Sequence, residues 1–114
     1  MNVVALVTDL FFATKIKSTA DALGTPLKAV RKLDDLDAAL TAGATLAIID
    51  MNADGVDHVE AIRRCKSAAS PPRVIAYLSH VQKDLATAAQ SAGADQIMPR
   101  SAFSAQLPDL LAQE

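Results

Sequence analysis

The chain has 114 residues, a net charge of −2, and a composition that is 51% hydrophobic but only 4% aromatic. This length predicts one domain spanning residues 1–114, with a core built from Ala, Leu, Val and Ile rather than from aromatic rings. The acidic balance argues against a nucleic-acid-binding domain, because such domains are usually basic with clustered Lys and Arg.

The first half of the chain alternates between apolar runs of strand length and stretches with helical spacing. Residues 3–7 are apolar on both faces, as a central parallel strand should be. A helix follows over residues 12–23. Residues 27–33 mix apolar with basic side chains, which predicts an edge strand. A short helix over residues 35–42 then leads to a third strand at residues 45–49.

The second half repeats the same alternation. A helix opens at Val56 and ends at the Ser-Pro-Pro run of residues 70–72. The fourth strand covers residues 73–78, and a helix over residues 81–92 follows it. A brief strand at residues 96–98 precedes the last helix, whose apolar positions run from 103 to 111.

Five strand–helix units in this order predict an α/β fold with a doubly wound, five-stranded parallel sheet in the flavodoxin-like order 2-1-3-4-5. Right-handed crossovers would place helices on both faces of the sheet. A (β/α)₈ barrel would need about twice the length. Pro108 falls inside the last helix and is expected to kink it or to delay its start.

The sequence contains no apolar stretch that approaches the ~18 residues of a membrane span. The N-terminus lacks the basic region of a signal peptide. Cys65 is the only cysteine, so no intramolecular disulfide can form and a reducing compartment is expected. We therefore expect a cytoplasmic protein that does not contact a membrane.

Polar residues stand where four of the apolar runs end: Asp9, Asp50, Ser79 and Arg100. The carboxyl ends of parallel strands meet at one rim of a sheet, where ligands bind. Asp9 and Asp50, with the backbone carbonyl of Asn52, predict a Mg²⁺ site. The metal would neutralise an incoming phosphoryl donor and leave Asp50 as the nucleophile. Ser79 and Arg100 would contact the phosphoryl oxygens.

Each of these residues also has a purely structural interpretation. Asp9 can cap the turn or helix that follows it, as strand-end aspartates often do. Ser79 can serve as the N-cap of the next helix, and Arg100 can be a solvent-exposed charge. Asp54 and Asp57 lack the rest of a calcium loop and are interpreted as a turn residue and an N-cap.

Over essentially its whole length the chain resembles a response-regulator receiver domain of the CheY-like type, the phosphoacceptor of two-component signalling. The resemblance is carried by VVALVTD, LAIIDMN, RVIAYLS, AAQSAGADQIM and the Pro99-Arg100 pair. It implies that Asp50 accepts a phosphoryl group from a sensor histidine kinase with Mg²⁺ bound nearby. In that family an acidic residue after the first strand binds the metal. A Thr or Ser after the fourth strand senses the phosphoryl group, and a Lys after the fifth pairs with it.

The chain departs from the family pattern at the positions that carry the chemistry. Receivers usually have two adjacent acidic residues after the first strand, but the first of the two is here Thr8. Counting back from Gly93 without gaps places Leu78, not Ser79, at the sensing position. An arginine stands for the lysine, which is not an interchangeable contact. A proline precedes it instead of following it, and the aromatic switch position is aliphatic (Arg100, Pro99 and Ile97).

Three functions are compatible with these patterns. The first is a stand-alone receiver, phosphorylated at Asp50 in a phosphorelay. The second is a pseudo-receiver that binds other proteins without phosphorylation. The third, a small flavin enzyme, is disfavoured, because the TDLFFATK loop has bulky Phe11 and Phe12 and no glycine for a phosphate, and no dinucleotide or P-loop motif is present. We therefore expect a non-enzymatic monomer or weak homodimer, with a sensor histidine kinase or other signalling protein as partner.

Overall fold

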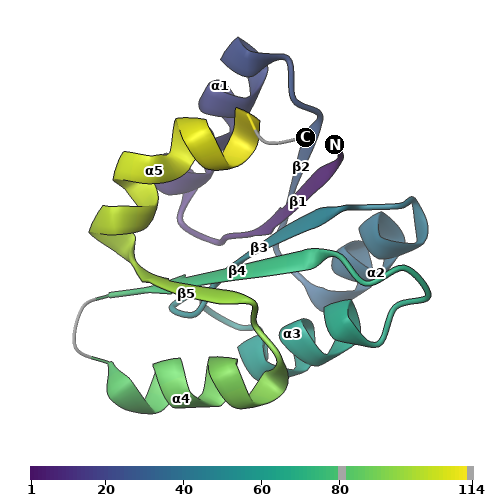
Figure 1. The fold of residues 1–114 in the computed structure, drawn as a ribbon, viewed down its shortest axis with the longest axis vertical. Coiled ribbons are helices and arrows are strands. Elements are labelled where there is room, and N and C mark those ends of the chain that lie inside the picture. The colour runs from purple at the N-terminus through teal and green to yellow at the C-terminus, as the bar shows by residue number, and fades with distance from the viewer. Residues whose placement is uncertain (80–81, 113–114) are drawn as a thin grey trace.

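Five parallel strands form the central layer of the structure, and helices cover both faces of this sheet (Figure 1). The computed structural model describes residues 1–79 and 82–112. The strand order is β2-β1-β3-β4-β5, so the predicted fold class and topology are confirmed. The strands are β1 (Val3–Leu6), β2 (Leu27–Val30), β3 (Leu46–Asp50), β4 (Arg73–Leu78) and β5 (Gln96–Pro99).

The helices divide between the two faces of the sheet, with α1 and α5 on one side and α2, α3 and α4 on the other (Figure 1). Their bounds are α1 (Leu10–Leu23), α2 (Leu33–Thr41), α3 (His58–Lys66), α4 (Lys83–Ala92) and α5 (Arg100–Ala112). Alternate strand residues supply the two cores. In β4, Ile75 and Tyr77 belong to one core while Val74 belongs to the other. The central strands β1 and β3 are buried on both faces, which explains their continuous apolar runs.

The second strand and the helix after it differ from the sequence prediction. The edge strand was expected over residues 27–33, but β2 ends at Val30 and α2 begins at Leu33. β2 pairs only with β1, whose four residues end at Leu6 opposite Val30. Once that partner strand ends, the backbone has no ladder to continue and is free to turn into the helix.

The starts of two other helices also differ from the prediction. α3 begins at His58 rather than at Val56, and Asp57 is its N-cap, accepting a hydrogen bond from the Glu60 amide at 3.0 Å, as interpreted from the sequence. α5 begins at Arg100 and continues through Pro108, so the proline does not delay the helix start. The predicted start of the fourth helix at Val81 lies outside the described residues.

A cluster of three aromatic rings ties α1, β4 and α5 together beneath the carboxyl-terminal rim of the sheet. Tyr77 stacks on Phe103 with ring centroids 4.5 Å apart, and Phe12 lies 5.2 Å from Tyr77 and 6.0 Å from Phe103. Offset aromatic pairs at such separations add stabilisation beyond the area that they bury. The few aromatic residues of this chain are therefore concentrated where the sheet rim must be held in place.

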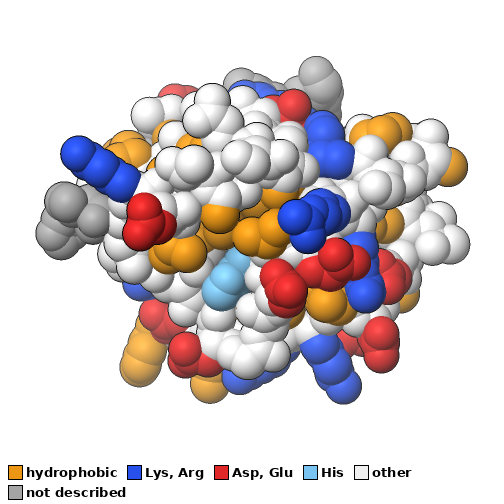
Figure 2. All heavy atoms as spheres, turned by 90° about the horizontal axis from the view of Figure 1, so that it is seen from below, with side chains coloured by type: hydrophobic (Ala, Val, Ile, Leu, Met, Phe, Trp, Pro, Cys, Tyr) orange, Lys and Arg blue, Asp and Glu red, His pale blue; other side chains and the backbone are white. Residues whose placement is uncertain are grey.

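The face of the molecule on which α3 and α4 lie, seen from below in Figure 2, carries both acidic and basic side chains with hydrophobic ones between them. Arg64 illustrates this pattern, since it pairs with Asp37 at 2.8 Å and with Glu60 at 3.0 Å. Charges of both signs therefore share this face. Within the described part of the chain, no helix combines the length and the hydrophobicity needed to cross a membrane.

Candidate functional site

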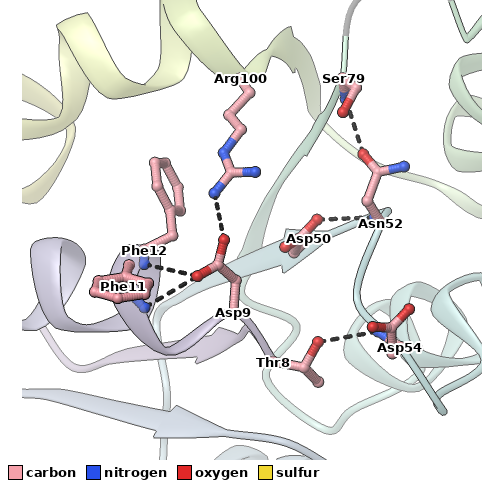
Figure 3. Close-up of polar contacts among 9 residues, drawn as sticks. All are labelled: Thr8, Asp9, Phe11, Phe12, Asp50, Asn52, Asp54, Ser79 and Arg100. Carbon is pink, nitrogen blue, oxygen red and sulfur yellow. Dashed lines mark hydrogen bonds and ion pairs between the residues drawn. The ribbon is translucent and has the colours of Figure 1, made fainter.

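The structure brings Asp9, Asp50 and Arg100 together at the carboxyl-terminal rim of the sheet (Figure 3). β1 and β3 are neighbours in register, with Leu6 opposite Ile49, so the residues that follow them emerge side by side. Asp50 is the last residue of β3, and Arg100 is the first residue of α5. The topology thus delivers two carboxylates and one guanidinium group to a common space.

Both carboxylate oxygens of Asp9 are engaged by groups of the protein itself. Oδ1 accepts hydrogen bonds from the backbone N–H groups of Phe11 at 3.0 Å and Phe12 at 3.2 Å, which makes Asp9 the N-cap of α1. Oδ2 accepts a hydrogen bond from Nη2 of Arg100 at 2.9 Å. The bond to Arg100 and that to the Phe12 amide hold the pKa of Asp9 below its usual value. The interpretation of Asp9 as a helix cap is therefore confirmed.

Arg100 is fixed by two contacts with the start of α1. Besides the ion pair with Asp9, its guanidinium carbon lies 4.2 Å from the centre of the Phe12 ring. A guanidinium over an aromatic face is attracted by the ring's quadrupole. Arg100 is therefore not a free solvent-exposed charge, although its side chain keeps 39% of its surface accessible.

Asp50 is the buried acid of the rim, with only 4% of its surface accessible. Its Oδ1 accepts a hydrogen bond from the backbone N–H of Asn52 at 2.8 Å. Burial raises the pKa of Asp50 above its usual value, and the opposing effects of the Asn52 N–H, the Tyr77 hydroxyl and the charge of Arg100 do not cancel it. The carboxylate that the sequence selects as phosphoacceptor is thus held in an environment that disfavours its charge.

Tyr77 is a rim residue that the sequence analysis did not select. It lies directly across from Asp50 in the β3–β4 register. Its hydroxyl is buried, and no described residue lies in hydrogen-bonding geometry with it. Burial and the nearby charge of Asp50 raise the pKa of Tyr77. The signal was available, because Tyr77 is the one residue of the RVIAYL run whose side chain carries a polar tip at the carboxyl end of a central strand.

Asn52 connects the loop after β3 with the loop after β4. Its side-chain Oδ1 accepts a hydrogen bond from the Ser79 amide at 2.8 Å, and its Nδ2 donates to Oε1 of Gln82 at 3.0 Å. Ser79 therefore takes part in the rim through its backbone. It is not the N-cap of α4, since that position is held by Gln82. Asn52 and Ser79, which the sequence assigned to metal and phosphoryl contacts, here join two loops.

Replacing Asn52 by alanine is expected to lower the free energy of unfolding by about 0.5–1 kcal/mol, because two hydrogen bonds at a partly solvated site are lost. The amide of Ser79 should exchange with solvent faster, since its acceptor is removed. Urea unfolding and amide hydrogen exchange measure the two effects. Asn2→Ala is the matched control, because the Asn2 side chain makes no hydrogen bond among residues 1–79 and 82–112. Equal effects of both substitutions would refute the connection.

The residues at the rim do not fit Mg²⁺ as they lie. The metal prefers several oxygen ligands in octahedral geometry, yet three donors of the protein already occupy the oxygens of Asp9. Thr8 stands where a second acid would, and its hydroxyl accepts a hydrogen bond from the Asp54 amide at 2.9 Å. Among the described residues, no three His, Cys, Asp or Glu side chains converge. The predicted ligand set of Asp9, Asp50 and Asn52 stays a prediction.

Comparison with solved structures places this architecture in a known class. A signal receiver domain of a response regulator from Bermanella marisrubri superposes with a TM-score of 0.83 at 18% identity, covering 96% of this chain and 93% of that one. A response regulator from Hahella chejuensis gives 0.82 at 15% identity, with 97% and 92% coverage. The receiver domain of NtrX from Brucella abortus gives 0.81 at 14% identity, with 97% and 98% coverage.

The chain therefore has the CheY-like receiver fold of response regulators, as its sequence resemblance predicted. No protein-family model matches the sequence, and no curated protein matches it either. At these low identities the similarity concerns the fold, and the activity has to be argued from the rim residues.

Proposed function

We propose that this chain is a receiver-fold module that binds another signalling protein without being phosphorylated. The proposal selects the pseudo-receiver interpretation of the sequence over the phosphoaccepting one. In this proposal the module acts in signalling, which is the context of the fold class. Its rim residues catalyse no reaction. A cytoplasmic location, a monomeric or weakly dimeric state, and a non-enzymatic role belong to the same proposal.

The observation that carries the proposal is that both carboxylate oxygens of Asp9 accept hydrogen bonds from groups of the protein itself. Phosphoryl transfer to a carboxylate depends on neutralising the charge of the donor. A cation at Oδ2 of Asp9 would have to displace Arg100, while Oδ1 caps the first turn of α1. Asp9, one of the two acids that motivate the phosphoaccepting interpretation, is therefore already engaged in structural contacts.

The groups that would respond to a phosphoryl group have also changed. Leu78 is 6% accessible and packs in the core on the α2, α3 and α4 side, so the position assigned to sensing offers no hydroxyl. Ile97 at the switch position is aliphatic and packs against the same core. A cleft of about 200 Å³ between α4 and β5 includes both residues in its lining.

The proposal predicts that acetyl phosphate with Mg²⁺ adds no phosphoryl group to the protein. Intact-mass spectrometry under non-acidic, rapid-quench conditions measures the change. A phosphorylatable receiver treated in the same tube is the positive control. A mass gain of one phosphoryl group that disappears in Asp50→Asn would overturn the proposal.

The second candidate, a phosphoaccepting receiver, is favoured by the burial of Asp50 at the end of β3 and by the proximity of Arg100. In that case Asp50 would receive the phosphoryl group from a sensor histidine kinase. Arg100 and Ser79 would contact the phosphoryl oxygens, and Asp9, Asp50 and Asn52 would hold Mg²⁺. The mass experiment separates this candidate from the first one.

A further inference from the structure

We propose that Arg100 is a built-in counter-ion that takes the place of a bound metal cation at the rim and excludes one from it. The inference deepens the proposed function and rests on it, because a permanently neutralised rim suits a module that works without phosphoryl transfer. The contacts of Arg100 carry the argument.

The guanidinium of Arg100 lies at the carboxylate oxygen of Asp9 that does not cap α1. Its Nη2 lies 2.9 Å from this oxygen, Oδ2. Figure 3 shows the guanidinium extending from the start of α5 toward Asp9, with Asp50 alongside. The positive charge of Arg100 also reaches Asp50 and acts to lower its pKa. One side chain therefore interacts with both acids of the rim.

Arg100 is held in this place by packing as well as by charge. The guanidinium lies 4.2 Å from the centre of the Phe12 ring, and the Phe12 amide donates to the same Asp9 carboxylate. Phe12 is 92% buried, so this ring is a fixed platform rather than a mobile surface group. Asp9, Phe12 and Arg100 thus form a closed three-residue unit. Binding of a metal by Asp9 would require this unit to open.

Electrostatics opposes the simultaneous presence of both cations. A divalent ion at Asp9 would face the guanidinium at close range, where like charges repel and solvent screens them incompletely. The guanidinium cannot lose its proton to relieve this repulsion. A metal would therefore bind only after Arg100 has left the rim.

The test is to remove the counter-ion and to measure Mg²⁺ binding directly, without any phosphoryl donor. Arg100→Gln is expected to bind Mg²⁺ at least about tenfold more tightly than the wild-type protein. Amide chemical shifts near Asp9 and Asp50 report the binding, and broadening by Mn²⁺ locates it. Arg100→Met keeps an apolar stem over Phe12 and is expected to behave in the same way.

Two control variants make the result specific. Arg64→Gln also removes one positive charge and releases two carboxylates, but its partners Asp37 and Glu60 lie on α2 and α3. It should leave the amides near Asp9 and Asp50 unresponsive to Mg²⁺. The double variant of Asp9→Asn with Arg100→Gln should lose the binding that Arg100→Gln gains.

Three results would overturn the inference. These are tight Mg²⁺ binding by the wild-type protein, absence of any gain in folded Arg100→Gln or Arg100→Met, and a gain that survives Asp9→Asn. The proposed function fails by a different result, namely phosphoryl transfer to wild-type Asp50. A wild-type protein that binds Mg²⁺ without being phosphorylated would refute the inference alone.

Discussion

Replacing Phe103 by alanine is expected to lower the free energy of unfolding by about 3–5 kcal/mol, a large part of the stability of a domain of this size. Phe103 is completely buried and stacks on Tyr77 at 4.5 Å. Truncation removes the ring that joins α5 to β4 and leaves a cavity among side chains that cannot collapse freely. Equilibrium urea unfolding, followed by circular dichroism, measures the loss.

Phe11→Ala is the matched control for this experiment. The same ring is removed, but Phe11 is 91% accessible at the start of α1, so the expected change is within about 0.5 kcal/mol. Phe103→Leu should fall between the two, since it keeps part of the buried volume. If Phe11→Ala were as costly as Phe103→Ala, the packing described for α5 would be incorrect.

The fold was predictable because its signal is redundant along the chain. The central strands β1 and β3 are runs of residues buried on both faces, and local features such as Asp9 before α1 and Gly93 after α4 bound several of the helices. The sheet order then follows from the handedness of the crossovers. Boundaries were less predictable. The end of β2 at Val30 is set by the length of its neighbour β1, which is a tertiary property.

The sequence predicted which residues lie at the rim, but not which of them form hydrogen bonds with one another. The sequence places Asp9, Asp50 and Arg100 at strand ends, and the structure gathers them there. The sequence does not reveal that Asp9 accepts a hydrogen bond from Arg100 rather than remaining available to a ligand, because this contact depends on where α5 starts relative to α1. The local pattern marked Tyr77 only as a polar tip at the end of a strand. That Tyr77 lies across from Asp50 in the β3–β4 register is a tertiary property, which the local pattern does not encode.

Asp50→Asn is expected to stabilise the protein at neutral pH by about 1–3 kcal/mol, the cost of a buried polar group whose bonding capacity is only partly used. The carboxylate of Asp50 is 4% accessible, and its Oδ1 accepts a hydrogen bond from the Asn52 amide. The carboxamide keeps an oxygen for that bond and removes the buried charge. Its NH₂ can donate to the nearby Tyr77 hydroxyl, which makes no other hydrogen bond with the described residues.

The pH dependence of this stabilisation follows from the raised pKa of Asp50. Burial makes the folded protein hold the Asp50 proton more tightly than the unfolded chain does, although the Asn52 N–H, the Tyr77 hydroxyl and the charge of Arg100 act in the opposite direction. The contribution of Asp50 to stability is therefore greatest below its unfolded pKa and declines as the pH rises through the folded pKa. The difference between Asp50→Asn and wild type should consequently be small in acid and grow toward neutrality.

Urea unfolding of both proteins from acid to neutral pH measures this difference, and it isolates Asp50 because contributions common to both proteins cancel. Asp9 acts with the opposite sign. The bonds of Asp9 to Arg100 and to the α1 amides lower its pKa, so its contribution is lost as the pH falls. Asp54→Asn, at an exposed carboxylate of the same loop, is the matched control and should leave stability nearly unchanged. A difference that is flat with pH, or a destabilised Asp50→Asn, would mean that the rim compensates the Asp50 charge fully, contrary to its observed burial.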